Sequence, residues 1–100
     1  MVSLQIEHQI PDYAKWRAAF DRDPAGREAS GVRRYRISRP ADDPNYIIVE
    51  LDFDDREAAD AFLAQMRGIW KQVEGTVMTG PKARIVESVD EHFYSRPERP

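Results

Sequence analysis

The sequence predicts an α+β domain in which two helices cover one face of a four-stranded antiparallel sheet. Two hydrophobic periodicities alternate along the chain, a period of two that is typical of strands and a spacing of three to four that is typical of helices. Stretches rich in turn residues separate the periodic segments. The predicted order of elements is therefore strand, helix, strand, strand, helix, strand.

The first strand and the first helix follow one another closely. Residues 2–10 alternate apolar and polar side chains, which is typical of a half-buried strand. Pro11 suits the first turn of a helix, where its missing N–H costs little. Tyr13, Trp16 and Phe20 then follow at spacings of three and four, so they predict an amphipathic helix.

The second half of the chain repeats this arrangement. Residues 32–39 and 46–53 alternate like strands, and the stretch 40–45 between them has the composition of a turn. Asp54, with Glu57 three residues later, resembles a capping box at the start of the second helix. The apolar stripe of that helix is Ala59, Phe62, Met66, Trp70 and Val73.

The last strand completes the predicted sheet. Residues 74–82 are predicted to form a loop and residues 83–89 the strand, so the domain covers residues 1–91 and residues 92–100 form a tail rich in proline and charge. Right-handed crossovers give a ferredoxin-like sheet in which the first and third strands are central and both helices lie on one face.

The two faces of this sheet are predicted to differ. The helix-facing side should carry Leu4, Ile6, His8, Tyr35, Ile37, Ile47, Val49, Leu51, Phe53, Ile85 and Val89. The other side mixes both signs of charge, and its candidate contact residues are Glu7, Arg34, Arg36, Tyr46, Ile48, Glu50 and Arg84. This second face is either a solvated surface or the interface of a symmetric homodimer in which arginines oppose glutamates. We favour the homodimer, because four strands rarely leave a whole sheet face bare.

Composition excludes several classes of protein. The net charge of −3 argues against a nucleic-acid binder, and acidic groups on the central strands argue against RNA on the sheet. The absence of cysteine excludes thiolate catalysis and cysteine-ligated metals. No signal peptide is recognisable and no apolar run approaches the ~20 residues of a membrane span, so we expect a cytoplasmic protein. The sequence contains no recognisable metal-ligand spacing, P-loop or dinucleotide-binding motif.

The phrases "HQIPDYAKWRAAFD" and "IIVELDFDDREAADAFL" resemble the dimeric α+β barrel superfamily, which includes the antibiotic-biosynthesis monooxygenase-like proteins. The resemblance spans about residues 3–89 and implies a homodimer with a ligand pocket between sheet and helices in each subunit. Some members are cofactor-free oxygenases and others degrade haem with a first-strand asparagine and a second-helix histidine. This chain has Gln5 and Gln9 on its first strand and no histidine in its second helix, so we expect no haem and no other cofactor.

The topology brings the end of the first strand, the start of the first helix, the end of the second helix and the loop 74–82 to the same end of the molecule. We expect a small apolar pocket there, lined by Tyr13, Trp16, Met66, Trp70 and Met78. Trp70 and the loop should be the neighbours of the candidate catalytic residue, His8.

Two interpretations of His8 stay open. It is a general base or proton shuttle, since imidazole titrates near neutrality, or it is a buried histidine that hydrogen-bonds Asp12 or a backbone carbonyl. The first fits a protein that binds a small apolar or aromatic metabolite, or a cofactor-independent enzyme of oxygenase or isomerase type. The alternative is a non-catalytic structural or interaction module whose aromatic residues all belong to the core.

Overall fold

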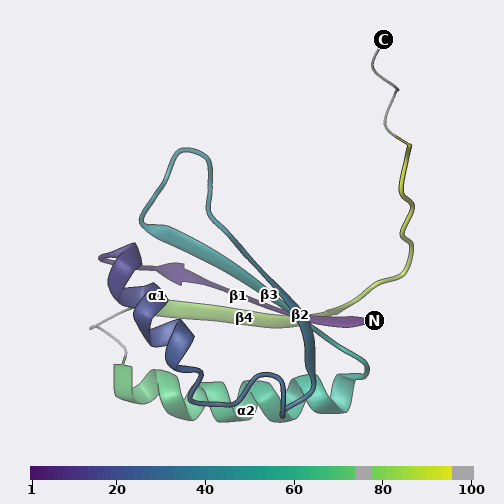
Figure 1. Ribbon diagram of the computed structural model, residues 1–100, viewed down its shortest axis with the longest axis horizontal. Coiled ribbons are helices and arrows are strands. Elements are labelled where there is room, and N and C mark those ends of the chain that lie inside the picture. The colour runs from purple at the N-terminus through teal and green to yellow at the C-terminus, as the bar shows by residue number, and fades with distance from the viewer. Residues whose placement is uncertain (74–77, 96–100) are drawn as a thin grey trace.

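A computed structural model describes residues 1–73 and 78–95 of the chain (Figure 1). Its elements are β1 (Val2–Gln9), α1 (Tyr13–Arg22), β2 (Val32–Ser38), β3 (Tyr46–Phe53), α2 (Arg56–Val73) and β4 (Thr79–Glu87). The strands form one antiparallel sheet in the order β2-β3-β1-β4. The predicted ferredoxin-like fold and the central position of the first and third strands are therefore confirmed.

The core lies between the sheet and the two helices. The apolar residues of β1 and β3 alternate inward, so that Leu4 lies opposite Leu51 and Ile6 opposite Val49 in the register. The helices contribute Trp16 from α1 and the buried positions Ala59, Phe62 and Trp70 of the predicted α2 stripe. The side chain of Val73 lies outside the part of the chain that is described. No helix among the described residues is long and apolar enough to cross a membrane.

The last strand begins earlier and ends earlier than predicted. Residues 79–82 belong to β4 rather than to a loop, while residues 74–77 lie outside the described residues. Gly80 has a φ of 61°, and the register against β1 shifts between Glu7 and Gln9, which is a bulge. Because β4 is an edge strand, it also tolerates Pro81. Val89 lies beyond the strand and is 93% exposed, so its predicted place on the helix-facing side was wrong.

Both helices begin later than predicted, because an aspartate caps each one. Pro11 precedes α1, and the Asp12 carboxylate accepts a hydrogen bond of 2.8 Å from the N–H of Ala14. At α2 it is Asp55 that accepts from the N–H of Ala58, at 2.8 Å. The predicted cap, Asp54, instead forms an ion pair with an arginine of β2.

Candidate functional site

A cavity of about 260 Å³ lies between the sheet and the helices. Its sheet side is formed by Ile6 and His8 of β1 and by Val49 and Leu51 of β3. Its helical side is formed mainly by aromatic and thioether side chains: Trp16, Phe20, Phe62, Met66 and Trp70. A small concave site with mostly apolar walls and few polar groups suits a small organic ligand.

Most of the residues predicted for the pocket line this cavity. His8, Trp16, Met66, Trp70 and Met78 all contribute to its surface, although β1, α1, α2 and the segment before β4 are remote from one another in sequence. Topology therefore brings these residues to the wall of one cavity.

Tyr13 is the exception, because it does not line the cavity. It is the first residue of α1 and is 37% exposed. Its ring lies beside Trp16 at a centroid distance of 5.9 Å, and the guanidinium of Arg39 lies 5.9 Å from its centroid. The ring of Tyr13 therefore packs beside Trp16 but stays outside the cavity.

His8 is the buried polar group of the sheet side. Its side chain is 3% exposed, and Nδ1 lies 3.2 Å from the carbonyl oxygen of Gln9. A carbonyl only accepts, so Nδ1 carries the proton and Nε2 holds the lone pair. Burial lowers the pKa of His8 below its ordinary value, and the hydrogen bond to Gln9 opposes this effect only in part. His8 is therefore a neutral base at neutral pH.

This shift predicts an acid-dependent loss of stability. The folded state binds a proton on His8 less readily than the unfolded chain, whose histidine titrates near 6.5, so unfolding takes up a proton in the window below that pH. The free energy of unfolding should be highest above pH 6.5, decline as the pH falls, and level off below the folded-state pKa. Urea unfolding of His8→Gln should lack this decline.

His92 provides the matched control for this measurement. It is the other histidine of the chain and lies exposed in the segment after β4. His92→Gln should therefore keep the full pH dependence of the wild type. If the unfolding free energy of His8→Gln depended on pH as steeply as that of the wild type, the lowered pKa could not belong to His8.

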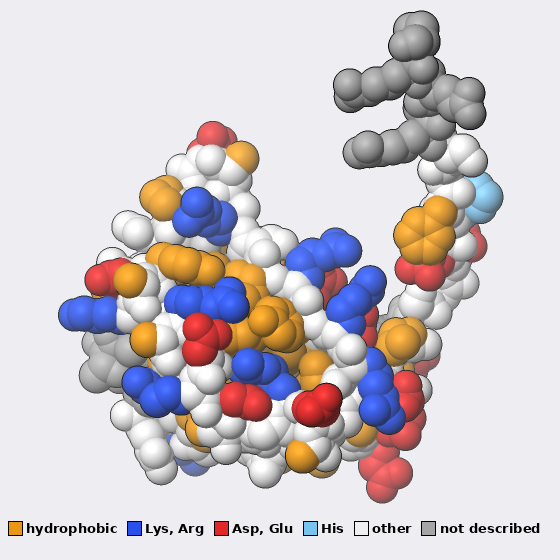
Figure 2. Space-filling view, in the orientation of Figure 1, with side chains coloured by type: hydrophobic (Ala, Val, Ile, Leu, Met, Phe, Trp, Pro, Cys, Tyr) orange, Lys and Arg blue, Asp and Glu red, His pale blue; other side chains and the backbone are white. Residues whose placement is uncertain are grey.

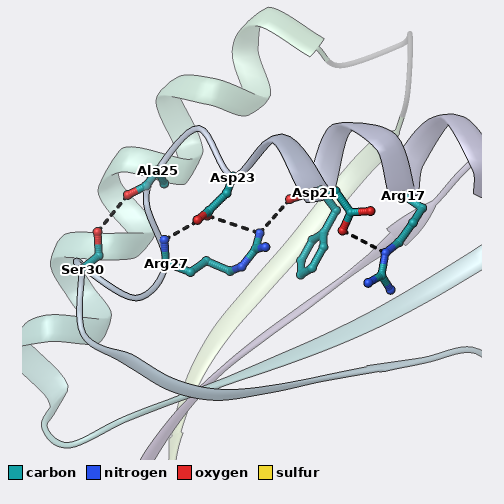
Figure 3. Close-up of polar contacts among 7 residues, drawn as sticks. Arg17, Asp21, Asp23, Ala25, Arg27 and Ser30 are labelled. Carbon is teal, nitrogen blue, oxygen red and sulfur yellow. Dashed lines mark hydrogen bonds and ion pairs between the residues drawn. The ribbon is translucent and has the colours of Figure 1, made fainter.

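A second polar cluster, which the sequence patterns did not predict, lines the cavity at the end of α1 (Figure 3). Asp23 ends the helix with a left-handed φ of 51°, and its Oδ1 accepts a hydrogen bond of 2.9 Å from the N–H of Arg27. The Arg27 guanidinium lies 3.8 Å from the centroid of the Phe20 ring and donates from NH1 to the Phe20 carbonyl at 2.8 Å. Hydrophobic periodicity gives no signal for this cluster, because Asp23 lies at the end of the helix and Arg27 in the turn that follows it.

Metal binding finds no support in this arrangement. In residues 1–73 and 78–95 there is no group of three or more histidine, cysteine, aspartate or glutamate side chains that could hold an ion.

Comparison with known proteins places this geometry among solved folds. No protein-family model matches the chain, and no curated protein matches it. SnoaB, a cofactor-independent oxygenase from Streptomyces nogalater, is similar with a TM-score of 0.71 and 16% identity over 90% of this chain and 94% of SnoaB. A mutant of MhuD, solved with two manganese protoporphyrin IX molecules per active site, is similar with a TM-score of 0.70 and 17% identity over 94% of this chain and 100% of the MhuD chain. A dimeric ferredoxin-like protein from an uncultured marine organism is similar with a TM-score of 0.68 and 12% identity, over 94% of this chain and 92% of that protein.

The chain shares the fold of the antibiotic-biosynthesis monooxygenase-like proteins. At these identities the likeness concerns the fold and not the side chains of the site. The expected absence of haem and of other cofactors therefore stays a prediction from the sequence.

The second face of this fold carries a network of polar contacts within the chain. Tyr46 donates a hydrogen bond of 2.7 Å to Glu7, and this contact, followed by burial, raises the pKa of Tyr46. Gln5 lies between two further predicted interface residues, since it donates to Glu50 at 3.2 Å and accepts from Arg84 at 2.9 Å. Glu7 and Glu50 thus have partners without a second subunit.

Arg34 also has its partner within the chain. Its guanidinium lies 2.7 Å from Asp52, which is only 6% exposed and also accepts a hydrogen bond from Ser3. The predicted pairing of arginines with glutamates across an interface is therefore revised, because Arg34 already forms an ion pair with an aspartate of β3 in its own chain. Arg36 and Ile48, the other predicted contact residues of this face, are exposed and half-buried respectively.

Proposed function

We propose that the protein is a cofactor-independent enzyme of oxygenase or isomerase type, acting on a small apolar or aromatic metabolite in the cavity. His8 is the general base. The observation that carries this proposal is a neutral, buried imidazole on the wall of an otherwise largely aromatic cavity of about 260 Å³. The composition predicts that it acts in the cytoplasm.

The geometry of His8 suits proton abstraction. With Nδ1 committed to the Gln9 carbonyl, the ring has a fixed tautomer, and Nε2 has no hydrogen-bond partner among the described residues. An acidic C–H or O–H of an aromatic ligand can transfer its proton to Nε2. The resulting carbanion or phenolate either takes back a proton at another carbon, which is isomerisation, or gives electrons to dioxygen. In the second case an activated methylene becomes a carbonyl, and the other oxygen atom leaves as water.

The likeness to SnoaB favours the oxygenase branch, because that protein is a cofactor-independent oxygenase of the same fold. The competing hypothesis is a non-catalytic module whose aromatic residues are all core. It predicts a cavity that stays empty of ligands. The hydrogen bond of His8 to the Gln9 carbonyl fits this alternative as well, so what favours the enzyme is the place of His8 on the wall of the cavity, with Nε2 left without a partner among the described residues.

A two-stage screen tests the proposal. The chain has two tryptophans, Trp16 and Trp70, and both line the cavity, so their indole N–H resonances report its occupancy. Small phenols and aromatic ketones with acidic C–H groups are screened by these two resonances. Compounds that bind are then assayed for oxygen uptake and for isomerisation, with no metal or cofactor added. Binding without turnover across the panel would favour the non-catalytic module.

We also propose that the protein is a homodimer joined through the second sheet face. Ile48 is half-buried among the polar side chains of this face, and a groove of about 530 Å³ lies between the face and the segment after β4. In that segment Phe93 is 82% exposed and Tyr94 86% exposed, and Figure 2 shows hydrophobic side chains along it. Large apolar groups held away from the body of a protein are typical of contacts with a second chain. A dimeric protein of the same fold supports the proposal.

Light scattering at micromolar concentration should give twice the chain mass of 11.6 kDa. Ile48→Glu should give a folded monomer, because it adds a charge to the proposed interface. Ala64→Glu also adds a charge, but on the exposed side of α2, which lies on the other face of the sheet, and it should stay dimeric. A wild-type monomer would contradict the homodimer.

A further inference from the structure

The guanidinium of Arg27 is held rigidly at the wall of the cavity. Its side chain is 18% exposed, and NH1 lies 2.8 Å from the Phe20 carbonyl and 3.4 Å from Asp23 Oδ1. The planar group lies over the Phe20 ring at 3.8 Å and also lies 5.4 Å from the centroid of Tyr35. An arginine fixed by several contacts loses little side-chain entropy when it binds a further partner.

The turn that carries Arg27 is itself tied down (Figure 3). The backbone N–H of Arg27 donates to Asp23 Oδ1 at 2.9 Å, and the hydroxyl of Ser30 donates to the Ala25 carbonyl at 2.9 Å. Gly26 bonds back to the Asp23 carbonyl at 3.0 Å and has a φ of 62°, which glycine adopts without strain. The guanidinium therefore has a fixed place relative to the cavity.

Arg27 keeps hydrogen-bonding capacity after these contacts. A guanidinium has five N–H donors in a planar fork, and the contacts to Phe20 and Asp23 use only NH1. In the described part of the chain, Nε and NH2 have no acceptor. Arg22 also belongs to the lining here, so this end of the cavity is lined by two arginines and a single aspartate, Asp23. This end of the cavity favours an anionic oxygen.

The two polar ends of the cavity are joined by aromatic side chains. The His8 ring lies 6.2 Å from Trp16, Trp16 lies 5.1 Å from Phe20, and Phe20 lies 3.8 Å from the Arg27 guanidinium. Trp16 and Phe20 are one turn apart on α1, and Arg27 follows the end of that helix. The row therefore runs along α1, with the base at one end and the cation at the other.

We propose that Arg27 determines substrate specificity and that the ligand is an aromatic acid. Its carboxylate binds the free donors of Arg27, and its ring lies beside Trp16 and Phe20. The acidic C–H or O–H of the ligand then lies toward His8. Only this last placement depends on the proposed function, whereas the charge selection by Arg27 does not.

The binding of two matched probes tests this inference without any reaction. The probes are 2-naphthoate, which is anionic, and 2-acetylnaphthalene, which has nearly the same shape and no charge. Binding of each is followed through the two indole N–H resonances. Arg27→Gln should weaken the binding of 2-naphthoate by about 10- to 100-fold, as expected for the loss of hydrogen bonds to a charged group. It should change the affinity for 2-acetylnaphthalene by less than about 2-fold. Arg27→Lys keeps the charge without the fork and should give an intermediate loss.

Arg17→Gln is the matched control. Arg17 is on the same helix and is paired with Asp21 at 3.0 Å, but it does not line the cavity. Removing its charge should leave both affinities unchanged. Wild-type positions of the indole resonances in each variant would show that the fold is intact.

Three results would overturn the inference: no binding of 2-naphthoate to the wild type at millimolar concentration, equal weakening of both probes in Arg27→Gln, or equal weakening of 2-naphthoate in Arg17→Gln and Arg27→Gln. The proposed function fails separately, through the absence of turnover. A protein that selects 2-naphthoate through Arg27 but turns over no compound would be a binding protein for aromatic acids.

Discussion

His8→Gln is expected to lower the turnover of a substrate that the cavity accepts by about 10²- to 10⁴-fold, the usual contribution of a positioned general base. Glutamine is polar and similar in length, and its amide can still donate a hydrogen bond to the Gln9 carbonyl. It offers no basic lone pair, because an amide does not take up a proton near neutral pH. Substrate affinity should change little, since the apolar walls are untouched. Steady-state kinetics on a substrate from the screen would measure both quantities.

The pH dependence of the rate separates a base from a merely structural histidine. In the wild type, kcat/KM should fall on the acid side as His8 becomes protonated, and the midpoint should lie below the ordinary value of 6.5 because burial lowers the pKa. The residual activity of His8→Gln should lack this acid limb, whereas His92→Gln should keep both the rate and the limb. Unchanged kcat in His8→Gln would show that His8 is a buried histidine bonded to a backbone carbonyl and nothing more.

The position of His8 was predictable because the side chains of a strand alternate with a period of two residues. Once the apolar side chains of β1 face the helices, every second residue must do so, and His8 pairs with Ile47 in the register. On α2 it is the helical spacing of three to four residues that placed Met66 and Trp70 on the side facing the sheet. Local pattern and topology were therefore enough to bring these residues to one end of the molecule.

Other features depend on contacts that periodicity does not encode. Two adjacent aspartates precede α2, and only the structure shows that Asp55 caps the helix while Asp54 pairs with Arg33 at 2.8 Å. The left-handed conformation of Asp23 turns the chain so that Arg27 returns over Phe20. A turn of this kind follows no regular spacing, so the cationic end of the cavity could not be placed from the sequence.

Phe53→Ala is expected to lower the free energy of unfolding by about 3–5 kcal/mol. Phe53 is fully buried, its ring lies 5.6 Å from that of Phe62, and it pairs in the register with Val2 and Val32. The backbone of Gly31 also approaches it, since a Cβ at that glycine would lie 3.9 Å from the Phe53 ring. Because these surroundings are closely packed, they cannot collapse into the space that the lost ring would leave. Denaturant unfolding should be measured at one fixed protein concentration, because dimer formation would add to the apparent stability.

A substitution at the closely packed end of the core should lower the stability of the fold without changing the affinity of the cavity for a ligand. Phe53 belongs to the closely packed end and does not line the cavity, so the folded fraction of Phe53→Ala should bind 2-naphthoate with wild-type affinity. Gln65→Ala changes an exposed side chain of α2, away from the proposed interface, and should change the unfolding free energy by no more than about 0.5 kcal/mol. A loss below about 1 kcal/mol in Phe53→Ala would contradict the packing of this end. A parallel loss of ligand affinity would mean that the cavity depends on the whole core, because its walls would then need Phe53 to hold their shape.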